Sequence, residues 1–136
     1  MPAGYSNTPT AKKLGLKDGH RVCVLNAPKN YVDLIGGLPK DLILTDRLSQ
    51  SADIVHVFVT KQADLTSRIQ LMRKAIAPDG AIWVSWPKKA SKVPTDVTED
   101  TIRKLALASG LVDVKVCAID EVWSGLKLVI PVAQRR

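Results

Sequence analysis

Short apolar runs, separated by polar, glycine and proline positions, dominate the pattern of this chain. The runs at 22–25 and 54–59 are apolar almost throughout, which is typical of strands buried on both faces, as in a parallel sheet. Near the end of the chain, apolar and polar positions alternate instead, as in half-buried strands. Six strands are therefore predicted, at 22–25, 42–45, 54–59, 81–86, 112–116 and 126–130.

Helical periodicity appears between these strands. Apolar residues three and four positions apart predict a short amphipathic helix at 31–38 and a longer one at 65–76. Thr98 is a good N-cap for a third helix, which Gly110 ends. A single helical turn is predicted at 11–16.

This alternation of strands and helices predicts an α/β protein. The link at 120–125 is too short for the crossover of about a dozen residues that joins parallel neighbours, so the last strand should run antiparallel. The link at 47–52 can just span a strand without a helix, which predicts thin cover over one sheet edge. We expect an arm at 1–10, one domain at 11–133 and a basic tail at 134–136.

Composition limits the classes of protein to which this chain can belong. The 136 residues carry a net charge of +7 and are 46% hydrophobic, which supports a core without metal or disulfide staples. No apolar run approaches the ~20 residues that span a bilayer, and residues 1–6 lack a secretory signal, so a cytoplasmic protein is expected. The charge is compatible with anionic partners, including nucleic acid held by Lys88, Lys89, Lys92 and the tail.

Three stretches resemble parts of the Rossmann-like methyltransferase domains that bind S-adenosylmethionine (SAM). They are the approach to the first strand, LGLKDGHRVCVL (14–25), the turn APDGAIWV (77–84) and the terminal strand pair at 110–132. The resemblance implies an α/β fold: a single three-layer Rossmann-like, methyltransferase-like domain. Its sheet would have six mostly parallel strands, with the last one antiparallel.

Nearly the whole chain is also similar to a family of small bacterial proteins catalogued as a domain of unknown function. The stretches GYS (4–6), WPKKAS (86–91) and VKVCAIDEVWSGLK (114–127) carry this resemblance. It implies no known activity.

The loop after the first strand departs from the methyltransferase pattern. Those domains have a glycine-rich turn there, because only glycine lets the backbone close on the cofactor. Here the positions hold Asn26, Ala27, Pro28, Lys29 and Asn30, and Pro28 has no N–H to donate. SAM binding at this loop is therefore disfavoured, and no cofactor is expected.

Candidate ligand-binding residues follow the strands, because ligands of open α/β sheets bind at the carboxyl ends of the strands. They are Asn26, Asp46, Thr60, Trp86, Lys88 and Lys89. Asp46 stands where such folds place an acid for a ribose hydroxyl, although turn chemistry beside Arg47 explains it equally. Trp86 with the two lysines could hold an anionic aromatic ligand; alternatively, Trp86 caps the core and the lysines form a solvated loop.

The remaining candidates point to packing or to a partner. Trp123 either folds over the sheet edge beside a turn that needs Gly125, or anchors a protein partner or second subunit. His56 lies within an apolar strand and is interpreted as a core histidine. No metal site is expected, because neither histidine has carboxylates or cysteines at ligand spacing. Ser85 and Ser91 lack the context of a hydrolase nucleophile, and catalytic residues stay unassigned.

These observations favour a Rossmann-like domain that has lost methyl transfer and acts as a small-ligand or protein-interaction module. The ligand would be an anionic or aromatic small molecule. Two alternatives stay open at this point: a SAM-dependent methyltransferase with a divergent cofactor loop, and a basic protein that associates with nucleic acid.

Overall fold

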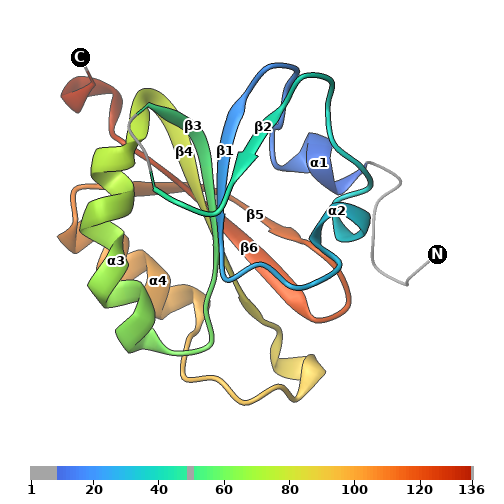
Figure 1. Cartoon of the computed structure of the whole chain (residues 1–136). Helices are drawn as coiled ribbons and strands as arrows, with labels where there is room; N and C mark the ends of the chain where they lie inside the picture. The colour runs from blue at the N-terminus through green and yellow to red at the C-terminus, as the bar shows by residue number, and fades with distance from the viewer. Residues whose placement is uncertain (1–8, 49–50, 136) are drawn as a thin grey trace.

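A six-stranded sheet forms the centre of the computed structural model, which describes residues 9–48 and 51–135 (Figure 1). Its strand order is β2-β1-β3-β4-β6-β5. The strands are β1 (Arg21–Leu25), β2 (Ile43–Thr45), β3 (Ala52–Phe58), β4 (Ile76–Pro87), β5 (Val112–Ala118) and β6 (Trp123–Val129). β1 to β4 pair in parallel, and β6 is antiparallel to both of its neighbours, so the predicted sheet is confirmed.

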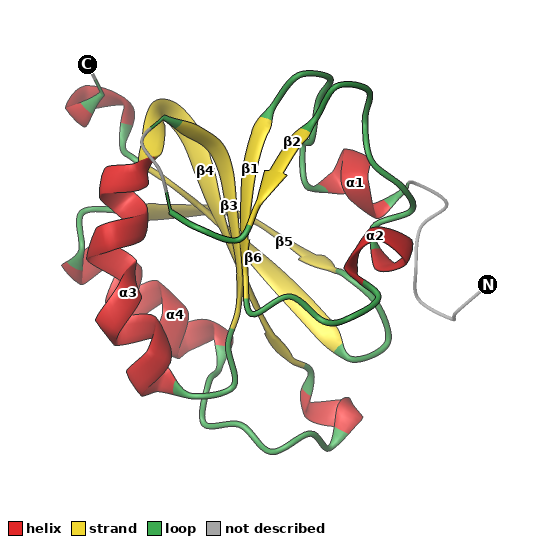
Figure 2. Cartoon of the chain, in the orientation of Figure 1, coloured by secondary structure: helices red, strands yellow, loops and turns green. Residues whose placement is uncertain are grey.

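Helices cover both faces of the sheet, which gives the expected three layers (Figure 2). One face carries α3 (Gln62–Ala75) and α4 (Glu99–Ala108), and the other carries α1 (Thr10–Lys13) and α2 (Tyr31–Leu34). Two short 3₁₀ turns complete the structure, η1 (Lys89–Ser91) and η2 (Val132–Gln134).

The alternation of side chains along the strands divides the core into two clusters. Val55, Val57 and Val84 face α3 and α4, whereas Ile54 and Trp83 face α1 and α2. The indole N–H of Trp83 donates to the Leu14 carbonyl at 2.9 Å, which ties the segment after α1 to the sheet.

The order of the strands in the sheet reverses at β1. β2 pairs on one side of β1 and β3 on the other, so β1 and its neighbours form the switch point at which ligands of such sheets bind. The connection from β2 to β3 has no helix in its described residues, 46–48 and 51. Ile43 and Leu44 are 53% and 40% exposed, which confirms the thin cover predicted over this edge.

Two elements differ from the sequence prediction. α2 is one turn long and Leu38 is exposed, because Gly36 and Gly37 both adopt positive φ and end the helix early. The stretch at 77–80, predicted as a turn before a strand, is instead an irregularity within β4, where the pairing with β3 shifts. A Cβ on Gly80 would lie 2.9 Å from the Asp53 carbonyl, so this close approach requires glycine.

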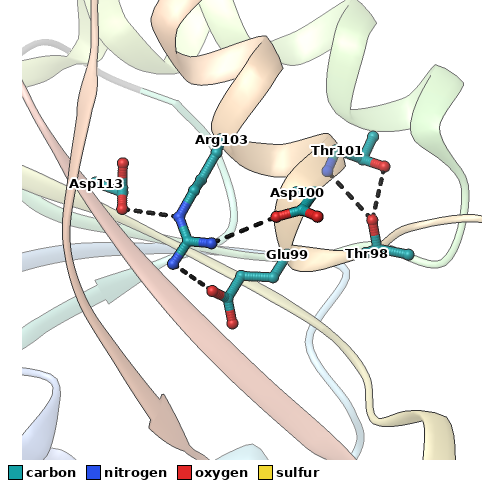
Figure 3. A network of polar contacts seen from close by, with 6 residues as sticks. All are labelled: Thr98, Glu99, Asp100, Thr101, Arg103 and Asp113. Atoms are coloured by element: carbon teal, nitrogen blue, oxygen red, sulfur yellow. Dashed lines mark hydrogen bonds and ion pairs between the residues drawn. The ribbon is translucent and has the colours of Figure 1, made fainter.

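The start of α4 is held by the cap that the sequence predicts (Figure 3). The Thr98 hydroxyl accepts a hydrogen bond from the Thr101 N–H at 3.2 Å. Arg103 pairs with Glu99 within the helix and with Asp113 of β5 at 3.0 Å, which links α4 to the edge of the sheet. No helix in the described part of the chain is long and apolar enough to cross a membrane.

Candidate functional site at the carboxyl ends of β1 and β2

A pocket of about 470 Å³ opens at the carboxyl ends of β1 and β2, on the face covered by α2. Its volume lies in the range of sites for small molecules, roughly 300–1,000 Å³. The lining combines apolar groups with amide, hydroxyl and charged ones: Val24, Ala27, Lys29, Asn30, Tyr31, Val32, Asp33, Leu44, Thr45 and Asp46.

The loop after β1 keeps a tight turn although it has no glycine. Asn26 adopts φ 57°, in the left-handed region that glycine favours and that asparagine tolerates best among other residues. Its side-chain N–H donates to the Phe58 carbonyl at 3.4 Å, across the end of β3. A tight turn is therefore formed here without glycine, and side chains occupy the loop.

A second pocket, of about 700 Å³, adjoins the first on the side of α3. The two pockets share Val24, Ala27 and Asp46, so they meet across the tips of β1 and β2. Arg47 and Arg68 line the second pocket and bring positive charge to it. Within the described residues, neither guanidinium has a hydrogen-bond or ion-pair partner.

Asp46 is the carboxylate common to both pockets. Its side chain is exposed at the end of β2, and its charge reaches the buried Cys23 thiol. Burial, with Asp46 as the second cause, raises the pKa of Cys23 to about 11, so this thiol stays protonated at neutral pH. The part of the rim shared by the two pockets thus presents one acid, Asp46, to a ligand, and Cys23 offers no reactive thiolate.

A buried polar chain supports the wall of the first pocket. The Tyr31 hydroxyl lies 2.9 Å from Nδ1 of His56, and His56 Nε2 lies 2.7 Å from the Ser85 hydroxyl. Burial lowers the pKa of His56 to about 3 and raises the pKa of the Tyr31 phenol. The imidazole is therefore neutral, and it confirms the interpretation of His56 as a core histidine.

The structure brings together only two of the six sequence-predicted ligand residues, Asn26 and Asp46. Thr60 lines a separate cavity of about 370 Å³, and its carbonyl accepts from the Thr95 hydroxyl at 2.7 Å. Trp86 is 8% exposed and packs in the core beneath α3 and α4.

The two lysines of the predicted rim lie along the strand end beyond Trp86. Lys88 is half-buried and donates its backbone N–H to the Val122 carbonyl at 2.7 Å, whereas Lys89 is exposed in η1. Because Trp86 faces the core, the stacking surface considered for an aromatic ligand is not formed beside them. Binding by Lys88 and Lys89 stays a prediction.

Trp123 is half-buried at the start of β6, with its ring 4.9 Å from that of Phe58 in an edge-to-face contact. This packing accounts for the side chain within the fold, and a role in anchoring a partner stays a prediction. No group of histidine, cysteine or carboxylate side chains in residues 9–48 and 51–135 could hold a metal ion.

Among the pocket residues that sequence reasoning did not select are Lys29, Tyr31, Arg47 and Arg68. Lys29 and Arg47 are adjacent to predicted strand-end positions and could have been included on that ground. Tyr31 was interpreted only as a core position of a helix. Nothing in the local sequence distinguishes Arg68 from other basic residues of α3.

The comparisons with known proteins agree with this fold. The model of a family described as "Protein of unknown function (DUF3052)" matches residues 29–132. A search of curated proteins found no significant match.

Solved structures of methyltransferases are similar in fold. A SAM-dependent methyltransferase from Aquifex aeolicus is 11% identical with a TM-score of 0.62, over 88% of this chain and 87% of that one. Magnesium protoporphyrin IX methyltransferase from Synechocystis PCC 6803, with bound SAH, is 14% identical with a TM-score of 0.51, over 83% and 75%. An O-methyltransferase from neocarzinostatin biosynthesis, in complex with SAM, is 10% identical with a TM-score of 0.61, over 82% and 49%.

The pocket residues fit the nucleoside part of SAM better than its amino-acid tail. The pocket on the α2 face has the size and the acid at Asp46 that suit a nucleoside. Beyond it, the loop offers the side chains of Ala27, Pro28 and Lys29 where the cofactor's amino-acid tail needs close backbone approach. The guanidinium groups of the adjoining pocket carry the same sign of charge as the sulfonium of SAM.

Proposed function

The chain belongs to the family described as Protein of unknown function (DUF3052), and we propose that it is a binding module for a nucleoside-containing small molecule rather than a methyltransferase. The observation that carries this proposal is the pocket of about 470 Å³ at the carboxyl ends of β1 and β2, with Asp46 at its rim. Asp46 accepts hydrogen bonds from the ribose hydroxyls, and Val24 and Leu44 contact the base.

Loss of methyl transfer is supported by the loop rather than by the fold. Pro28 supplies no backbone N–H, and the positions around it carry side chains. The charged residues that line the pocket are Lys29, Asp33 and Asp46, and no catalytic role is assigned to any of them. The site therefore binds and orients a ligand without an assigned reaction.

Isothermal titration calorimetry with adenosine and with SAM tests this function. Adenosine is expected to bind at one site, and SAM at least about tenfold more weakly, because the sulfonium approaches the guanidinium groups of Arg47 and Arg68 in the adjoining pocket. Asp46→Asn should lower adenosine affinity about tenfold, as expected for the loss of a charged hydrogen-bond acceptor.

Asp41→Asn is the matched control, since Asp41 is an exposed carboxylate at the opposite end of β2. It should leave adenosine affinity within about twofold of the parent protein. Equal losses in the two variants, or the absence of adenosine binding, would refute the proposed site.

One observation favours the alternative of a methyltransferase with a divergent loop. Asn26 adopts a positive φ, the conformation that glycine favours, so a tight turn after β1 is formed without glycine. Micromolar SAM binding in the same calorimetry would make this alternative the better account. Association with nucleic acid through Lys88, Lys89 and Lys92 stays a prediction that a steep salt dependence of binding would support.

A further inference from the structure

The second pocket is lined by positively charged groups that a nucleoside alone would not bind. Arg47 follows Asp46 at the end of β2, Arg68 belongs to α3, and both residues line this pocket. Two elements far apart in the chain therefore place guanidinium groups around one hollow. In the described part of the chain no carboxylate pairs with either of them.

Guanidinium groups recognise phosphate with several charge-assisted hydrogen bonds in a fixed geometry. Elsewhere in the fold, the half-buried Arg103 is paired with carboxylates of α4 and β5. The pocket's own acid, Asp46, lies at the shared rim, where it also lines the nucleoside pocket. The α3 side of the site is thus positively charged and the rim between the pockets is negative.

We propose that Arg47 and Arg68 form a phosphate subsite, so that the physiological ligand is a phosphate-bearing nucleoside that spans both pockets. The nucleoside occupies the pocket beside α2, and the phosphate lies in the pocket beside α3. The shared residues Val24, Ala27 and Asp46 make one ligand able to reach both. This inference rests on the proposed nucleoside site and names the class of its ligand.

The same two guanidiniums account for selection against SAM. A phosphate has up to two negative charges and gains from both guanidiniums, whereas SAM offers them a single carboxylate and a sulfonium that they repel. The subsite thus distinguishes a phosphate-bearing nucleoside from SAM, although both ligands contain a nucleoside. This selection by charge does not depend on the absence of glycine from the loop after β1.

Titration with adenosine, adenosine 5′-monophosphate and adenosine 2′-monophosphate, each at low salt, tests the subsite. At least one monophosphate should bind about tenfold or more tightly than adenosine, which is the gain expected from charged hydrogen bonds. Arg47→Gln and Arg68→Gln should each remove most of this gain and leave adenosine affinity within about twofold. The gain should also shrink as salt is raised.

Arg21→Gln is the matched control, because Arg21 is exposed at the amino end of β1 and its loss changes net charge equally. It should keep the full preference for the monophosphate. Thermal unfolding of all three variants checks that they fold, as expected for exposed or partly exposed arginines.

The outcomes separate the two proposals. Adenosine that binds as tightly as both monophosphates, or a preference that Arg21→Gln reduces as much as the pocket variants do, would overturn the subsite and leave the nucleoside site standing. Failure of adenosine and of both monophosphates to bind would overturn both. A single-stranded oligonucleotide that binds more tightly than either monophosphate would replace the free nucleotide as the ligand.

Discussion

His56 lies at the centre of a sheet face, between the hydroxyls of Tyr31 and Ser85. A neutral imidazole offers one donor and one acceptor, so each ring nitrogen can be satisfied without a charge. Phe58 stacks on the same ring, with 4.4 Å between centroids. The residue therefore stabilises the wall of the pocket beside α2 only while it is unprotonated.

This arrangement predicts a dependence of stability on pH. The folded pKa of about 3 lies below the ordinary value of 6.5, so the unfolded chain binds a proton in this window and the native state does not. The contribution is complete above the ordinary value and is lost as pH falls toward the folded one. Between about pH 7.5 and pH 5, urea unfolding should show a loss of roughly 2 kcal/mol.

His56→Gln should reduce this loss of stability at acid pH, because glutamine does not titrate. His20→Gln serves as the control, since His20 is the only other histidine and lies partly exposed in a turn. If His56→Gln loses as much stability at acid pH as the parent protein does, the pH dependence comes from other groups.

At the scale of elements, α4 depends most on local sequence and α2 least. Thr98 caps α4, Glu99 and Asp100 lie in its first turn near the positive end of the helix dipole, and Ile102 anchors its apolar face (Figure 3). α2 has no side-chain cap, and its position is fixed by the buried Tyr31 instead. The wall of the candidate site is thus held by tertiary contacts.

Thr98→Ala is expected to lower the free energy of unfolding by about 1 kcal/mol, because the N–H that the hydroxyl satisfies loses its partner. Chemical denaturation measures the change directly. Thr66→Ala makes the same chemical change on an exposed face of α3 and should fall within about 0.5 kcal/mol of the parent protein. A loss in Thr66→Ala equal to that in Thr98→Ala would contradict the cap.

At the scale of the whole molecule, the sheet could be predicted because its strands are apolar runs of the right length, such as 54–59, and its turns carry specific residues such as Gly110. The site could be predicted only in part. All strand-end residues share one edge of the sheet, but alternation sends Trp86 into the core while Asn26 and Asp46 stay at the rim. Arg68 joins them only through the packing of α3, which local sequence does not specify.

We propose that the carboxyl ends of β1 and β2 bind a phosphate-bearing nucleoside and reject SAM. Amide chemical-shift mapping with adenosine 5′-monophosphate and with SAM, added separately to the same labelled protein, tests it most directly. The account predicts that the monophosphate shifts the amides of Ala27, Tyr31 and Asp46 while SAM leaves them unchanged. SAM that shifts these amides at micromolar concentration, or a monophosphate that shifts none of them, would contradict it.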